Sequence, residues 1–236
     1  MRDSLRHFIA ELVGVFTLVF IGGAVIMLSK NAGTGVGLLE IAAAHGIALA
    51  VMITATMRIS GHLNPAVTIG FLVTRRIEPM MAGVYIVAQL TGAMLGAYAL
   101  RAIFPDALFT AARGGGQVIS LDISSAQAFF AELIATFFLV FVVFGTAVDR
   151  QAPRLGGFPI GLTVFADILA IGPLTGGSMN PARSFGPAVA SGVYEGQVIF
   201  WTAPIVGGMI AAVLYAVLFL RHPVEPPDHG AVRARG

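Results

Sequence analysis

The sequence predicts an all-α membrane protein in which six transmembrane helices and two re-entrant half-helices form an inverted 3+3 repeat. The first observation is composition, because 57% of the 236 residues are hydrophobic and only 11% are charged. Globular proteins carry about 25% charged residues, so this chain cannot cover a water-soluble surface of ordinary charge density. The second is six apolar runs of spanning length, and the third is two half-length apolar segments that both begin with Asn-Pro-Ala.

Composition and motifs also exclude several classes of protein. The apolar content excludes disorder, and the absence of Cys excludes a disulfide framework or a cysteine-metal site. A net charge of +2, with scattered basic residues, does not suggest nucleic acid as a partner. No Ser/His, paired Asp or metal-ligand cluster is expected at membrane depth, so we expect no enzyme activity, metal or cofactor. The first apolar run contains Glu11 and has no small-residue cleavage site, so it is interpreted as a retained span.

The length of each apolar run decides whether it can cross a bilayer. A helix needs about 20 residues to cross a hydrocarbon core of about 30 Å. Six runs qualify, at 8–28, 38–57, 81–103, 126–147, 157–173 and 199–220. Two others, 65–73 and 181–189, would cover only about 13 Å as helices, roughly half the core. The remaining segments are expected to be turns, the longest at 105–125, and 221–236 is expected to be a cytoplasmic tail.

The distribution of basic residues predicts the orientation of the chain, because cytoplasmic loops of membrane proteins are enriched in Lys and Arg. With the N-terminus in the cytoplasm, that side carries nine arginines: Arg2, Arg6, Arg75, Arg76, Arg150, Arg154, Arg221, Arg233 and Arg235. The opposite side carries only Lys30, Arg101 and Arg113. Both termini are therefore expected to be cytoplasmic. Short termini and the use of Arg in place of Lys suggest the inner membrane of a bacterium.

An internal repeat organises the chain. Ala-Glu-Leu at 10–12 returns at 131–133, and the Asn-Pro-Ala motif at 64–66 returns at 180–182. The two separations, 121 and 116 residues, are nearly equal, so we infer one duplicated unit, with copies at about 8–104 and 126–220. Each copy has three spans, and an odd number of spans turns the second copy upside down. We therefore expect a single transmembrane domain over 1–236.

The two Asn-Pro-Ala motifs are the most informative feature. Asn is a favoured N-cap and Pro is favoured at the first helical position, so each motif should begin a short helix. The cap bond uses the side-chain oxygen and leaves the amide NH₂ as a donor. In an inverted repeat, both positive helix ends and both amides would converge near the membrane centre. A single Asn-Pro-Ala is usually an ordinary turn or helix start, but two copies in register disfavour that interpretation. The motifs are Asn64-Pro65-Ala66 and Asn180-Pro181-Ala182.

These features resemble the aquaporin (major intrinsic protein) family over residues 10 to about 220. The resemblance rests on Gly-His-Leu-Asn-Pro-Ala-Val-Thr at 61–68, Gly-Ser-Met-Asn-Pro-Ala-Arg-Ser-Phe-Gly-Pro at 177–187, and the Ala-Glu pairs that open spans one and four. It implies a passive channel for water and small neutral solutes in a lipid bilayer, usually assembled as a homotetramer with one pore per subunit. No nucleic acid is expected among the partners.

The sequence also has two carboxylates at membrane depth and two loops that would form the pore wall. Glu11 and Glu132 lie inside the membrane, where a carboxylate is costly unless it is paired or hydrogen-bonded. A proton relay is one interpretation; the resemblance favours the other, in which they accept hydrogen bonds from the re-entrant loops. The stretches before each Asn would present carbonyl oxygens along the pore, from Gly61, His62, Leu63, Gly176, Ser178 and Met179.

The resemblance also implies a selectivity filter. Arg183 would belong to the narrowest constriction, together with His45, Ile168 and Gly177; taken alone, His45 is more often an interhelical hydrogen-bond partner. This set is similar to the filter of plant tonoplast intrinsic proteins, some of which pass ammonia as well as water. Ser184, which follows Arg183, argues against the glycerol branch. Asp167 stands where we expect a neutral polar group, and we assign it no function.

Two alternatives stay open at this point. Within the channel class, the pore could be a broader facilitator for glycerol, urea or a metalloid acid. In another class, an ion- or proton-coupled secondary transporter is also commonly built from inverted repeats. That transporter would need Glu11, Glu132 or Asp167 to line the substrate route and to change protonation.

Overall fold

The computed structural model describes residues 2–220, so the predicted tail lies outside the described residues. Six helices in this part of the chain are long and apolar enough to cross a membrane, which confirms the predicted spans. They are α1 (Arg2–Ser29), α2 (Leu38–Thr56), α4 (Pro79–Ile103), α6 (Ser125–Val143), α7 (Phe158–Thr175) and α9 (Gln197–Leu218). A π-helical turn, η2 (Phe144–Val148), extends α6.

The two half-length segments are short helices, α3 (Pro65–Val73) and α8 (Pro181–Ser191). Asn64 and Asn180 cap them, and Pro occupies the first helical position in both. α8 runs two residues beyond the predicted end and stops at Gly192, whose φ of 76° is the left-handed conformation that commonly ends helices. The prediction of two half-length helices is confirmed.

The prediction of a turn over 105–125 was wrong in part. The segment contains a short helix, α5 (Asp106–Ala111), and a 3₁₀ turn, η1 (Arg113–Gly115). Six residues are too few to show helical periodicity, so the pattern did not predict α5. Phe109 on α5 is buried, and the chain after η1 turns inward so that Gln117 is buried as well.

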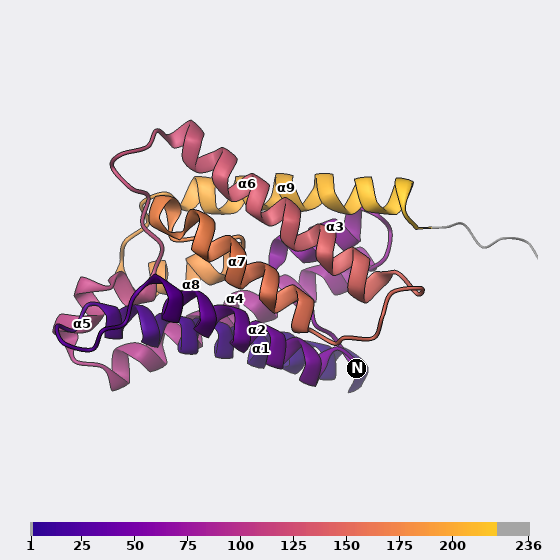
Figure 1. Cartoon of the computed structure of the whole chain (residues 1–236). Helices are drawn as coiled ribbons and strands as arrows, with labels where there is room; N and C mark the ends of the chain where they lie inside the picture. The colour runs from indigo at the N-terminus through magenta and orange to yellow at the C-terminus, as the bar shows by residue number, and fades with distance from the viewer. Residues whose placement is uncertain (1, 221–236) are drawn as a thin grey trace, which may run out of the picture.

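The packing of the helices follows the repeat. α1 packs against α4, and α6 packs against α9 in the same relation. Figure 1 shows α1 running away from the end of the bundle that carries the N-terminus and α6 running back toward it. Each half-helix packs against the last span of the other copy, α3 on α9 and α8 on α4. The two copies are therefore inverted and interlocked.

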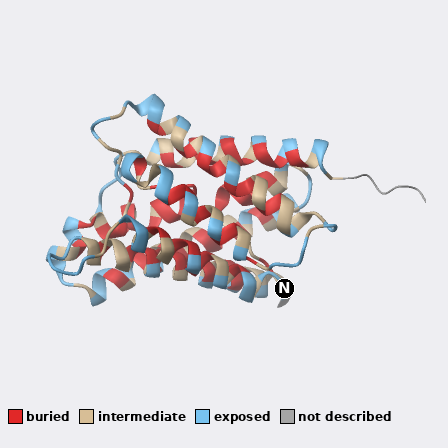
Figure 2. Ribbon diagram, in the orientation of Figure 1, coloured by how far each residue is buried: buried red, intermediate tan, exposed pale blue. Residues whose placement is uncertain are grey.

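Close approach between helices depends on equivalent glycines in the two copies. A Cβ added at Gly92 on α4 would overlap the carbonyl of Leu12 on α1, and a Cβ at Gly207 on α9 would overlap the carbonyl of Leu133 on α6. Small residues let membrane helices approach in this way, since helix association in lipid relies on packing. Figure 2 shows buried residues gathered where the helices face one another and exposed residues on the outer faces.

Candidate functional site

The tips of α3 and α8 meet through their capping asparagines. Asn64 Oδ1 accepts from the Ala66 N–H (2.9 Å), and its Nδ2 donates to the Met179 carbonyl (2.8 Å). In the same way Asn180 Oδ1 accepts from the Ala182 N–H (3.0 Å), and its Nδ2 donates to the Leu63 carbonyl (2.8 Å). The two amides therefore join the two loops reciprocally.

This geometry corrects one expectation. The sequence predicts that each amide NH₂ is wholly available to a molecule in the pore, but one N–H of each is already bonded to the opposite loop. An amide has two N–H donors, so one remains at each tip. Both asparagines line a common central cavity, as the convergence of the two positive helix ends requires.

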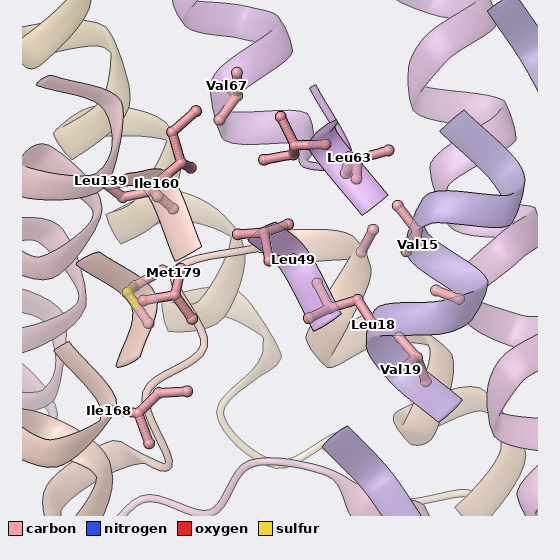
Figure 3. Packing of buried hydrophobic residues seen from close by; sticks show 14 of the residues in the cluster. Val15, Leu18, Val19, Leu49, Leu63, Val67, Leu139, Ile160, Ile168 and Met179 are labelled. Carbon is pink, nitrogen blue, oxygen red and sulfur yellow. The ribbon is translucent and has the colours of Figure 1, made fainter. Parts of the chain in front are cut away.

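This cavity, called the lumen below, is narrow and lined by two kinds of side chain. Its volume is about 20 Å³. A cavity needs roughly 10–15 Å³ by that measure to hold one water. Its apolar wall includes Leu49, Leu139 and Ile160, which come from three different helices (Figure 3). Its polar wall is formed by His45, His62, Asn64, Ser178, Asn180 and Arg183.

Glu11 holds the loop before Asn64 in place. Its carboxylate accepts from the backbone N–H groups of His62 (2.9 Å) and Leu63 (2.7 Å), from Gln89 Nε2 (2.6 Å) and from the Ser60 hydroxyl. The carboxylate is fully buried. Irregular backbone at membrane depth must be hydrogen-bonded within the protein, and this side chain supplies the acceptors.

Glu132 does the same for the second loop. It accepts from the N–H groups of Ser178 (2.8 Å) and Met179 (2.7 Å) and from the Thr175 hydroxyl (2.6 Å). The residue before each Asn, Leu63 or Met179, has a positive φ of 48° or 50°, a conformation that non-glycine residues rarely adopt. The described residues that line the lumen include neither Glu11 nor Glu132. The geometry thus favours support of the loops over a proton relay.

The predicted wall residues divide into three groups. His62, Ser178 and Met179 line the lumen, whereas Gly176 lines a second cavity at the end remote from the N-terminus. Gly61 and Leu63 are not among the described residues that line the lumen. The Leu63 side chain packs in the core, and its carbonyl is occupied by Asn180.

The four residues assigned to the constriction come together. His45, Ile168, Gly177 and Arg183 all line the lumen. Arg183 Nε and Nη2 lie 3.0 and 2.9 Å from His45 Nε2. His45 Nδ1 lies 2.8 Å from the Ile41 carbonyl, which can only accept, so Nδ1 carries the proton and Nε2 is the acceptor for Arg183. This pattern describes a neutral histidine.

Gly177 occupies a position in the lumen wall that does not accommodate a side chain. Its φ is +61°, and an added Cβ would lie 3.1 Å from Ile168 Cγ1. Any side chain there would be strained and would press against Ile168. Of the four residues assigned to the constriction, His45 and Arg183 are therefore polar, whereas Gly177 and Ile168 contribute no polar side chain.

The sequence did not indicate one further residue of this site. Gln117, on the chain after η1, is 8% exposed. With its amide oxygen turned to the guanidinium, it accepts from Arg183 Nη1 at 2.8 Å. A buried guanidinium needs acceptors for five N–H donors. The sequence could therefore indicate that Arg183 needs a further acceptor, but not which residue supplies it.

Asp167 remains without a role in this geometry. It is 7% exposed, and its Oδ2 has no hydrogen-bond partner within residues 2–220. It precedes Ile168 on α7 but is not among the described residues that line the lumen. An ion-coupled transporter would need a carboxylate on the substrate route, and neither Asp167 nor the two glutamates is placed there.

Comparisons with known proteins agree with this geometry. The family model described as major intrinsic protein matches residues 1–215. Aquaporin TIP4-4 of Zea mays is 39% identical over 233 residues, which cover 94% of this chain and 90% of the relative. Nodulin-26 of Glycine max is 39% identical over 219 residues, covering 91% and 78%. The X-ray structure of the aquaglyceroporin from Plasmodium falciparum superposes with a TM-score of 0.80 at 26% identity, covering 91% of this chain and 96% of that chain.

Proposed function

Because the chain belongs to the major intrinsic protein family, whose members are passive channels and not enzymes, we propose that it conducts water and ammonia and excludes ions. The observation that carries this proposal is the polar triad of His45, Gln117 and Arg183 at one end of a lumen whose volume has room for about one water molecule. Multi-pass insertion in a membrane follows from the family and from the six apolar helices.

The size and polarity of the lumen support small neutral substrates. Water and ammonia are both small, carry a lone pair, and can exchange hydrogen bonds with the remaining N–H groups of Asn64 and Asn180. Glycerol and urea are larger and would have to displace side chains of a lumen with a volume of only about 20 Å³. The narrow lumen therefore argues against the broader facilitator.

Electrostatics support the exclusion of cations. The N-termini of α3 and α8 each carry about +0.5 elementary charge, and Arg183 adds a full charge at the constriction. A cation would lose its hydration shell there against a positive potential, and the idealised cost of desolvating an ion is on the order of tens of kcal/mol. A neutral molecule loses only hydrogen bonds that the wall replaces.

We also propose the inner membrane of a bacterium as the location, with the N-terminus in the cytoplasm. Figure 1 shows the N-terminus and the α6–α7 loop, which carries Arg150 and Arg154, at the same end of the bundle. The family resemblance further suggests a homotetramer with one lumen per subunit, and the repeats suggest one domain over 1–236. Cross-linking in native membranes would test the tetramer.

Stopped-flow measurements on proteoliposomes test the function. We expect water and ammonia permeabilities well above those of protein-free vesicles, with urea and glycerol close to them. Glycerol flux comparable to water flux would favour the broader facilitator, and flux that saturates at low substrate or collapses with an uncoupler would favour a coupled transporter.

The substitution His45→Ala tests the constriction itself. Removing the imidazole should widen the lumen beside Arg183 and raise urea and glycerol permeability relative to water. The matched control is His7→Ala, because His7 stacks on Tyr85 and is not among the described residues lining the lumen. Unchanged solute selectivity in His45→Ala would mean that the assigned constriction is wrong.

A further inference from the structure

A further cavity lies at the end of the bundle that carries the N-terminus. It has a volume of about 630 Å³ and is formed by the ends of α2 and η2 and by the loop before α7. Met57 in its wall lies one helical turn beyond Ile53, and Ala147 one turn beyond Val143, and Ile53 and Val143 line the lumen. Residues one turn apart share a helix face, so this cavity, called the inner vestibule below, lies along the same faces of α2 and of α6 with η2 as the lumen.

Three arginines give the inner vestibule an excess of positive charge. They are Arg58, Arg150 and Arg154. Within residues 2–220 the salt bridges are Arg6–Asp3 and Arg113–Glu195, so none of the three is ion-paired there.

The single carboxylate among the described lining residues does not neutralise this charge by a salt bridge. Asp149 Oδ1 accepts from the Gln151 N–H at 2.9 Å, and Oδ2 accepts from the Tyr215 hydroxyl at 3.3 Å. The carboxylate thus holds the turn that carries Arg150. The loop is also attached to α2, because the Gly157 N–H donates to Thr54 Oγ1 at 2.9 Å.

The cavity at the other end of the lumen differs in size and in charge. It has a volume of about 200 Å³ and contains two basic residues, Lys30 and Arg113. Arg113 Nη1 lies 2.8 Å from Glu195 Oε2, so one of these two basic side chains already has an acidic partner. Within residues 2–220, the inner vestibule therefore has three basic side chains without an acidic partner, and the cavity at the other end has one, Lys30.

We propose that the inner vestibule binds a multivalent phosphate-bearing anion from the aqueous phase, and that the bound anion restricts flow through the lumen. The planar guanidinium forms paired hydrogen bonds with phosphate oxygens, and the vestibule volume lies within the range of about 300–1,000 Å³ typical of ligand sites. The lumen is too narrow to admit such an anion, so the anion stays at its mouth. The restriction of flow rests on the proposed function, whereas binding does not.

An acidic lipid headgroup offers the same phosphate chemistry. We favour the soluble anion because the three arginines lie just after α2 and on the loop before α7, beyond the ends of the spans, and not along their outer faces. A lipid source predicts that vesicles with acidic lipid alone would reproduce the effect, so the test includes that arm.

Binding is measured by calorimetry on the full chain in phosphatidylcholine nanodiscs, with inorganic pyrophosphate as the probe. We expect saturable binding that weakens as salt rises. The double substitution Arg150→Gln/Arg154→Gln should lower the affinity by about tenfold or more. The matched control, Arg75→Gln/Arg76→Gln, changes two arginines that are not among the described vestibule residues and should leave the affinity unchanged. No saturable binding, or an equal loss in the control, would overturn the site.

Flow is measured on liposomes loaded with pyrophosphate on both faces. The probe should lower water permeability several-fold in the native chain and leave that of Arg150→Gln/Arg154→Gln unchanged. Binding without a change in flux would overturn the restriction of flow, whereas no water flux even without the probe would refute the proposed function and leave the binding result intact. If phosphatidylglycerol without pyrophosphate lowers flux and abolishes pyrophosphate binding, the soluble source is wrong.

Discussion

The substitution Glu132→Gln separates support of the second re-entrant loop from proton transfer. The carboxylate accepts three hydrogen bonds, from Thr175, Ser178 and Met179. A glutamine of the same size keeps one acceptor oxygen, and its NH₂ group replaces the oxygen that faces the Met179 N–H. That N–H is then buried without an acceptor.

The magnitude follows from the cost of that unpaired donor. A buried polar group that loses its partner costs about 1–3 kcal/mol. Taking about 2 kcal/mol and the scaling for chains of 150–250 residues, the melting temperature should fall by roughly 4–8 °C. Water permeability should fall as well, because Ser178 and Met179 line the lumen.

The assay combines thermal unfolding in detergent with water and proton flux in liposomes. The matched control is Glu40→Gln, because exposed Glu40 accepts a single hydrogen bond, from the Gly37 N–H at 2.8 Å, and its loss should change little. If Glu132→Gln keeps its stability and water flux but loses a proton-coupled flux, the loop-support argument is refuted and Glu132 is a proton carrier.

Two further substitutions test the constriction. Gly177→Ala places a methyl group 3.1 Å from Ile168 Cγ1 at a φ of +61°. Overpacking of this kind costs about 1–3 kcal/mol of stability, so the melting temperature should fall by roughly 2–12 °C. Stopped-flow water permeability should fall as well, and undiminished flux would show that this wall is not narrow. Gln117→Leu removes a neutral acceptor of Arg183 and should alter the ratio of ammonia to water permeability. The control is Gln127→Leu, on the exposed first turn of α6. An unchanged ratio in Gln117→Leu would exclude Gln117 from the constriction.

Local sequence signals were sufficient for the parts of the fold that local chemistry determines. Asn followed by Pro satisfies the first backbone groups of a helix, so α3 and α8 could be located to within two residues. The Ala-Glu-Leu repeat at 10–12 and 131–133 also placed Glu11 and Glu132 in equivalent positions, and each accepts hydrogen bonds from the equivalent loop.

Features that depend on distant parts of the chain could not be predicted in the same way. Gln117 reaches Arg183 only because α5 and η1 turn the chain inward, and a six-residue helix gives no periodic signal. The bond from Asn64 to the Met179 carbonyl joins residues 115 positions apart. Convergence of the two tips was predictable from the repeat, but the use of one N–H of each amide to join the loops was not.

The most direct test of the account asks whether the loop beside Asn180 faces a water-conducting lumen. The chain has no Cys, so Ser178→Cys introduces a single thiol in the lumen wall, and Ser125→Cys provides a matched thiol on the exposed start of α6. The account predicts that a small mercurial abolishes most of the water permeability of Ser178→Cys, that a reducing thiol restores it, and that Ser125→Cys and the native chain are unaffected. Full water permeability after the Ser178→Cys thiol has been labelled would contradict it.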